Sequence, residues 1–84
     1  MATMPTITLY GKPDCPLCDK AEAQLRRWCS ASDVAIEIVD ITQDDDLYAR
    51  YWAEIPVIAF MDGTTLYAPI DEAELRRALQ RGVG

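Results

Sequence analysis

The chain has 84 residues, of which 14 are acidic, 8 are basic and none is histidine, so its formal net charge is −6 at pH 7. Half of the residues are hydrophobic and 26% are charged, as in soluble globular proteins, and we expect a single domain over residues 1–84. The negative charge argues against nucleic acid and membrane partners, because both are bound through basic patches.

The first half of the chain predicts a strand, a helix and a second strand. Residues 6–10 alternate between polar and apolar positions as a strand does, and residues 16–29 have the apolar spacing of an amphipathic helix. A loop at residues 30–33 leads into a β-branched run at residues 34–41, which predicts a buried strand. The expected core side of the helix consists of Cys18, Ala21, Leu25, Trp28 and Cys29.

The second half predicts a short helix, a β-hairpin and a last helix. Thr42 followed by Asp45 resembles a capping box and predicts a helix that ends near residue 52. Its aromatic side chains share one face, which we expect to lie in the core or to cover the sheet: Tyr48, Tyr51 and Trp52. The later elements are a strand at residues 57–61, an Asp62-Gly63 turn, a strand at 64–67 and a helix at 71–81.

The predicted order is therefore β-α-β-α-β-β-α, which is typical of an α/β domain. A helical crossover between the first two strands makes them parallel, and the hairpin makes the last two antiparallel. We expect a mixed four-stranded sheet flanked by helices.

Two cysteines in the segment KPDCPLCD, Cys15 and Cys18, carry the clearest chemical signal. A structural zinc site needs four ligands, whereas the chain has no histidine and only one further cysteine, Cys29. Cys29 would lie about 16 Å beyond Cys18 along the helix, too far for a shared site or a disulfide, and is expected to be a core residue. The N-terminal segment does not resemble a signal peptide, so we expect a cytoplasmic protein, in which stapling disulfides are rare. The pair is therefore expected to exchange electrons.

The helix start assigns different roles to the two thiols. Pro16 suits the first helical position, which makes Cys15 the N-cap. A sulfur there faces the N–H groups of Leu17 and Cys18 and the positive end of the helix dipole, which favour the thiolate. Lys12 adds a nearby positive charge, and Asp14 and Asp19 oppose it, so a moderately lowered pKa is predicted. Cys18, one turn deeper, is expected to be more buried and less ionised. Cys15 is thus the predicted nucleophile and Cys18 the predicted resolving thiol.

A strand followed by Lys-Pro-Asp-Cys-Pro-Leu-Cys at a helix start resembles the glutaredoxins of the thioredoxin superfamily, whose usual motif is Cys-Pro-Tyr-Cys. The similarity extends over essentially the whole chain and is greatest to a small group of bacterial glutaredoxin-like proteins. It implies a thioredoxin-like fold and a cis peptide bond before Pro56 that faces the cysteine pair. The backbone of Ile55 would then pair with an incoming peptide or with glutathione.

The resemblance also implies further substrate-binding residues. Lys12 and Leu17 would belong to the substrate site, with Lys12 near the glycyl carboxylate of glutathione. Asp71 matches the acidic residue that binds the glutamyl group in glutaredoxins. The glycine pair that precedes this acidic residue in glutaredoxins is absent, and Pro69-Ile70 stands in its place.

The expected function is that of a thiol–disulfide oxidoreductase that transfers electrons in cell redox homeostasis. Its partners would be protein or small-molecule disulfides, with glutathione or a thioredoxin-reductase-type system as reductant, and we expect a monomer. No metal and no tightly bound cofactor are expected, and glutathione would be a co-substrate. Two alternatives remain open: an iron–sulfur cluster held between two protomers by Cys15 and glutathione, and a binding module whose cysteines are incidental.

Overall fold

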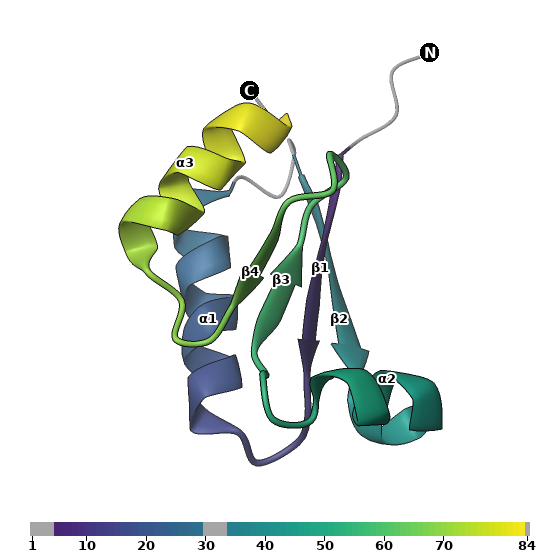
Figure 1. Ribbon diagram of the computed structural model, residues 1–84. Coiled ribbons are helices and arrows are strands. Elements are labelled where there is room, and N and C mark those ends of the chain that lie inside the picture. Colours follow the sequence, from purple (N-terminus) through teal and green to yellow (C-terminus); the bar gives the residue numbers. More distant parts are fainter. Residues whose placement is uncertain (1–4, 30–33, 84) are drawn as a thin grey trace.

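The computed structural model describes residues 5–29 and 34–83, so the loop expected at residues 30–33 lies outside the described residues. Within these ranges no helix is long and apolar enough to cross a membrane. The predicted order of strands and α-helices is confirmed, with one additional short 3-10 helix (Figure 1). The elements are β1 (Thr6–Gly11), α1 (Pro16–Trp28), β2 (Ala35–Asp40), η1 (Ile41–Gln43), α2 (Asp45–Tyr51), β3 (Val57–Ala59), β4 (Thr65–Tyr67) and α3 (Glu72–Val83).

The described strands form one mixed sheet in the order β2-β1-β3-β4. β1 runs parallel to β2 and antiparallel to β3, and β3 pairs antiparallel with β4, as the sequence predicts. The prediction of a fully buried strand at residues 34–41 is wrong. β2 lies at the edge of the sheet, and its residues Glu37 and Ile38 are exposed because no further strand or described helix covers them.

The hydrophobic core lies between the sheet and the pair of helices α1 and α3, which cover the same face of the sheet (Figure 1). Alternation along β1 sends Ile7 and Leu9 into this core, while Thr6, Thr8 and Tyr10 lie on the other face. From the helices, the buried residues of the core are Ala21, Leu25, Leu75, Ala78 and Leu79.

Trp28 was expected in the core, and this prediction is wrong: 42% of its surface is exposed. Its indole N–H donates a hydrogen bond of 2.8 Å to the carboxylate of Glu72, and the guanidinium of Arg76 lies 4.5 Å from the centre of its ring. Trp28 therefore joins α1 to α3 at the surface, where its ring is packed and its N–H has a polar partner.

The predicted cap at Thr42 is also wrong. Asp40 accepts hydrogen bonds from the backbone N–H of Thr42 at 2.9 Å and from its hydroxyl at 2.6 Å, so Thr42 lies inside η1. These bonds lower the pKa of Asp40 below its ordinary value. The bond from the hydroxyl of Thr42 has the largest effect, and the bond from its backbone N–H comes second. α2 begins later, with Asp44 as its N-cap, and the side chain of Asp44 accepts from the N–H groups of Asp46 and Leu47.

The three aromatic side chains of α2 and its C-cap are expected to lie in the core or to cover the sheet. Tyr51 does so, because its ring stacks on Tyr10 of β1 with the ring centres 4.8 Å apart. Tyr48 and Trp52 are exposed, so they do not lie in the core.

The packing of α3 on the core generates a stability prediction. Leu75 is completely buried, and Leu75→Ala is expected to lower the free energy of unfolding by roughly 2–5 kcal/mol, since the cavity adds to the loss of apolar contacts. Urea denaturation followed by circular dichroism measures this loss. The matched control is Leu17→Ala, where 60% of the leucine surface is already exposed and a change below about 1 kcal/mol is expected. Equal losses in the two variants would contradict the assignment of Leu75 to the core.

Candidate functional site

The cysteine pair lies where β1 passes into α1, at the end of the molecule that is lowest in Figure 1. After Gly11 the chain turns through Pro13 and Asp14, and Asp14 has a positive φ of 59°, a conformation that aspartate adopts more readily than most residues. Pro16 is the first residue of α1 and Cys15 is its N-cap, as predicted. The turn therefore presents the sulfur of Cys15 to the N-terminus of the helix.

Cys15 and Cys18 form a disulfide, with their Cα atoms 5.2 Å apart. The backbone N–H of Cys18 donates a hydrogen bond of 3.1 Å to the sulfur of Cys15, which confirms one of the two predicted contacts. The two residues expose similar fractions of their surface, 9% for Cys15 and 6% for Cys18, so the expected difference in burial is small in this disulfide form. What distinguishes the two sulfurs here is their position on the helix.

Gly11, the last residue of β1, lets α1 lie close to the sheet at this point. A Cβ atom on Gly11 would lie 3.1 Å from the sulfur of Cys18 and 3.2 Å from its Cβ, closer than side chains normally approach. A side chain at position 11 would therefore press on the disulfide.

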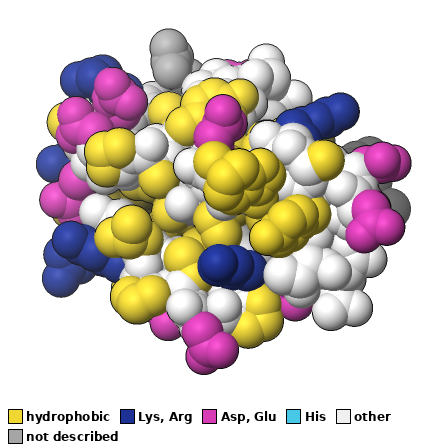
Figure 2. Space-filling view, turned by 60° about the horizontal axis from the view of Figure 1, so that its bottom comes forward, with side chains coloured by type: hydrophobic (Ala, Val, Ile, Leu, Met, Phe, Trp, Pro, Cys, Tyr) yellow, Lys and Arg dark blue, Asp and Glu magenta, His cyan; other side chains and the backbone are white. Residues whose placement is uncertain are grey.

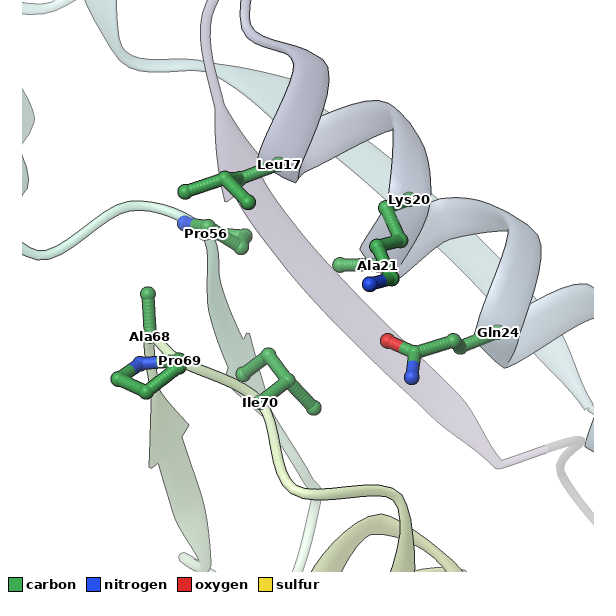
Figure 3. Close-up of a pocket in the computed structure, with 8 residues that line it drawn as sticks. All are labelled: Leu17, Lys20, Ala21, Gln24, Pro56, Ala68, Pro69 and Ile70. Atoms are coloured by element: carbon green, nitrogen blue, oxygen red, sulfur yellow. The ribbon is translucent and has the colours of Figure 1, made fainter.

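A groove opens beside the pair on one side of α1, with a volume of about 100 Å³. We call it the proline groove. Figure 3 shows side chains of α1 along one wall and the residues at Pro56 and after β4 along the other. Its lining residues are Leu17, Lys20, Ala21, Gln24, Pro56, Ala68, Pro69 and Ile70.

Both prolines of the groove follow a cis peptide bond. The bond between Ile55 and Pro56 is cis, as the resemblance implied, and the bond between Ala68 and Pro69 is also cis, which the sequence did not predict. The N–H of Ile55 donates a hydrogen bond of 3.1 Å to the carbonyl of Tyr51. Substrate pairing at Ile55 therefore remains a prediction that depends on its carbonyl oxygen.

Lys12 does not line the proline groove. It belongs to a second cavity, of about 250 Å³, which lies on the other side of α1 and is lined by Cys18. Three acidic residues also line this cavity: Asp19, Glu22 and Asp40. The structure thus brings Lys12 near Cys18, and separates it from Leu17 and Pro56.

Asp71 lines neither of these two cavities. Its carboxylate accepts a hydrogen bond of 2.9 Å from the N–H of Ala73, and its carbonyl accepts one from Leu75, so Asp71 caps α3. Its predicted contact with glutathione stays a prediction.

Cys29 lies at the C-terminal end of α1 and packs against the core as a partly buried residue, as predicted. Burial raises the pKa of its thiol, so little of it is thiolate at neutral pH. In the described ranges, no group of three or more histidine, cysteine or carboxylate residues has an arrangement that suits a metal ion.

Lys20 and Gln24 line the groove although no sequence motif marked them as site residues. A signal was present, because residues three, four and seven positions after Leu17 lie on the same side of a helix. Residues on one side of a helix line a groove only when another segment packs opposite them. Here that segment is Pro56 and residues 68–70, which are distant from α1 along the chain.

The end of the molecule that carries the pair is rich in hydrophobic surface. In Figure 2, which turns this end toward the viewer, hydrophobic side chains cluster in the middle and most charged ones lie at the margin. The elements at this end contribute exposed Leu17 from α1 and exposed Tyr48 from α2. An apolar patch around reactive sulfurs is typical of a contact surface.

Comparison with known proteins agrees with this geometry. The family model of the glutaredoxin-like domain (DUF836) matches residues 6–80. The chain is similar to protein XcR50 from X. campestris, at 35% identity and a TM-score of 0.75, over 89% of this chain and 96% of that one. It is also similar to desulfothioredoxin from Desulfovibrio vulgaris Hildenborough, at 25% identity and a TM-score of 0.68, over 94% and 82% of the two chains.

A mutant thioredoxin from Halobacterium salinarum NRC-1 shares the fold at 16% identity and a TM-score of 0.72, over 95% of this chain and 75% of that one. The mixed sheet and the helices on it are therefore those of a thioredoxin-like fold. The Cys15–Cys18 pair at the start of α1 fits the CxxC motif and supports a redox role. On its sequence, its fold and its cysteine pair, the chain belongs to the glutaredoxin-like domain family (DUF836).

Proposed function

We propose that this domain is a thiol–disulfide oxidoreductase, in which the dithiol of Cys15 and Cys18 reduces protein or small-molecule disulfides. One observation carries the proposal: the two sulfurs are bonded to each other at the start of α1, and the sulfur of Cys15 accepts the N–H of Cys18. This N–H and the positive end of the helix stabilise a negative charge on Cys15. Cys15 is therefore the attacking thiolate.

The reaction proceeds in two exchange steps. The Cys15 thiolate attacks one sulfur of the substrate disulfide, a mixed disulfide forms, and the other substrate sulfur leaves as a thiolate that takes a proton from water. Cys18 then loses its proton to water and attacks the sulfur of Cys15, which releases the second substrate thiolate and leaves the Cys15–Cys18 disulfide. Two electrons have passed to the substrate, and an external thiol or dithiol reductant restores the pair.

The ammonium group of Lys12 is proposed to offset part of the negative charge near the pair. It lines the cavity next to Cys18, where an ammonium group favours a thiolate, although Asp19, Glu22 and Asp40 on the same cavity act in the opposite direction. The domain is further proposed to act as a monomer in the reducing environment of the cytoplasm, as expected from the sequence.

Glutathione is proposed to be a poor co-substrate. Where glutaredoxins have two glycines, Pro69 has no backbone N–H to donate, and Ile70 adds a branched side chain that packs against the core. The carboxylate of Asp71 already accepts the N–H of Ala73. A glutamyl group would therefore find fewer hydrogen-bond donors here than in a glutaredoxin.

Substitution of each cysteine tests the assigned roles. Cys15→Ser is expected to abolish reduction of a small disulfide, because the nucleophile is lost. Cys18→Ser is expected to accumulate mixed disulfides with the substrate, which mass spectrometry detects as adducts on Cys15. In the reduced protein, Cys15 is expected to react with iodoacetamide faster than Cys18 near neutral pH, with a pKa below the ordinary value of about 8.5.

The matched control is Cys29→Ser, which removes the third thiol of the chain and is expected to leave turnover intact. Turnover by Cys15→Ser, or faster alkylation of Cys18 than of Cys15, would contradict the proposal. Partner binding that survives loss of both cysteines, with no exchange activity in the native protein, would favour a binding module instead.

Gly11→Ala tests the packing around the resolving thiol. Because the added methyl would lie 3.1 Å from the sulfur of Cys18, the variant is expected to lose about 1–3 kcal/mol of stability and to resolve mixed disulfides more slowly. Urea denaturation and rapid-quench alkylation measure the two effects. Gly63→Ala serves as control, because position 63 has a positive φ of 95° but no neighbour within 4 Å, so only stability should fall. Unaltered chemistry at Cys18 in Gly11→Ala would show that this contact is unimportant.

The proposal on glutathione is tested by glutathione-coupled reduction of a glutathionylated peptide, beside a glutaredoxin with the intact glycine pair. Loss of one or two charge-assisted hydrogen bonds predicts a kcat/KM at least about tenfold lower for this protein. Pro69→Gly restores a backbone N–H and is expected to recover part of the difference. Equal efficiency of the two native proteins would show that Pro69-Ile70 is an adequate substitute for the glycines.

A further inference from the structure

We infer that the proline groove selects substrates by sequence: it takes an apolar side chain adjacent to the substrate cysteine, and Lys20 binds a carboxylate on the second or third residue from that cysteine. This inference rests on the proposed function and names its substrate class. The preferred substrates are disulfides of polypeptides in which an apolar residue and then an acidic residue flank the reactive cysteine.

The end of the groove nearest the pair is apolar. Leu17 follows Cys15 by two residues, exposes 60% of its surface, and points toward Pro56 in Figure 3. Pro69 and Ile70 complete this part of the lining. An apolar side chain placed between Leu17 and Pro56 would shield both from water, which favours a leucine-like group over a polar one.

The size of the groove matches one side chain. Its volume of about 100 Å³ is well below the roughly 300–1,000 Å³ of pockets that enclose whole small-molecule ligands. A polypeptide that crosses the surface and inserts one side chain fits this volume, whereas a ligand that must be enclosed does not.

The length of the groove gives the spacing along the substrate. Leu17 and Gln24 mark its two ends on α1 and are seven residues apart, which corresponds to about 10 Å along the helix axis. An extended polypeptide advances about 3.3 Å per residue, so three substrate residues span the groove. Lys20 lies between these ends, within reach of the second or third residue from the substrate cysteine.

The positive charge of Lys20 indicates that the second substrate group is a carboxylate. Among the described residues that line the groove, Lys20 is the charged one and no carboxylate is present. The neighbouring acids of α1, Asp19 and Glu22, line the cavity on the other side of the helix. Lys20 also borders an adjoining cavity with Arg27 and with Glu72, whose carboxylate accepts the indole N–H of Trp28. The chain as a whole carries a net charge of −6, so Lys20 makes the groove a locally basic site on an acidic protein, and it complements a carboxylate.

The test compares disulfide-linked dimers of three peptides with symmetric flanks, which makes the result independent of chain direction: Glu-Ala-Leu-Cys-Leu-Ala-Glu, Glu-Ala-Ser-Cys-Ser-Ala-Glu and Lys-Ala-Leu-Cys-Leu-Ala-Lys. The reduced protein is expected to reduce the leucine peptide about tenfold faster than the serine peptide. It is expected to favour the glutamate peptide over the lysine peptide about threefold at low salt, and less at high salt. The net charge of −6 would by itself favour the lysine peptide, so this preference must come from the groove.

Variants assign each preference to its residue. Leu17→Ser is expected to remove most of the preference for leucine, and Lys20→Glu to reverse the preference for glutamate. Arg77→Glu makes the same change of charge on an exposed residue of α3 that lines neither the groove nor the adjoining cavity that Lys20 borders, so it should leave both preferences and the reduction of hydroxyethyl disulfide unchanged.

Each result has a distinct meaning. No reduction of any peptide or of hydroxyethyl disulfide would contradict the proposed function itself. Reduction of all three peptides at equal rates, a faster reaction with the lysine peptide, or equal effects of Lys20→Glu and Arg77→Glu would overturn the groove inference while the oxidoreductase proposal stands.

Discussion

The structure around the reactive pair depends on the close contact between the end of β1 and the first turn of α1. Gly11 has no side chain, so the sulfur of Cys18 can lie directly against the sheet. Pro16 starts the helix at once, which leaves Cys15 as its N-cap and directs the N–H of Cys18 to the sulfur of Cys15. One short segment therefore places both sulfurs and exposes Cys15 to the positive end of the helix dipole. Within it, Gly11 acts through its lack of a side chain, and Pro16 through its preference for the first helical position.

α1 separates two environments that serve different steps of the proposed reaction. One side of the helix, with Leu17 and Lys20, forms the proline groove together with Pro56 and the segment after β4. The other side, with Cys18, borders a cavity that contains Lys12 and several carboxylates. The proposed reaction assigns substrate selection and the ionisation of Cys18 to different faces of α1, so a substitution on one face should leave the other step unchanged.

Hydrophobic patterns predicted the elements well but misplaced large amphipathic side chains. Trp28, Tyr48 and Trp52 have the spacing of buried residues, yet all three are exposed. An indole or phenol can pack its ring on a neighbouring helix and keep its polar group near water or a carboxylate, as Trp28 does with Glu72 and Arg76. The position of such a ring depends on which element lies next to it, and this is a tertiary property.

The sequence by itself determined the order of the elements, the mixed sheet and the capping of α1 by Cys15, because periodicity, turn residues and proline act over a few neighbouring positions. The cis peptide bond before Pro56 was predicted only from the family resemblance, and the cis bond before Pro69 was not predicted. Only the tertiary structure decided that Lys12 and Asp40 share a cavity beside Cys18, and that Lys20 faces Pro69 and Ile70 across a groove. These relations join segments distant along the chain, and their geometry is set by how the helices and loops pack on the sheet.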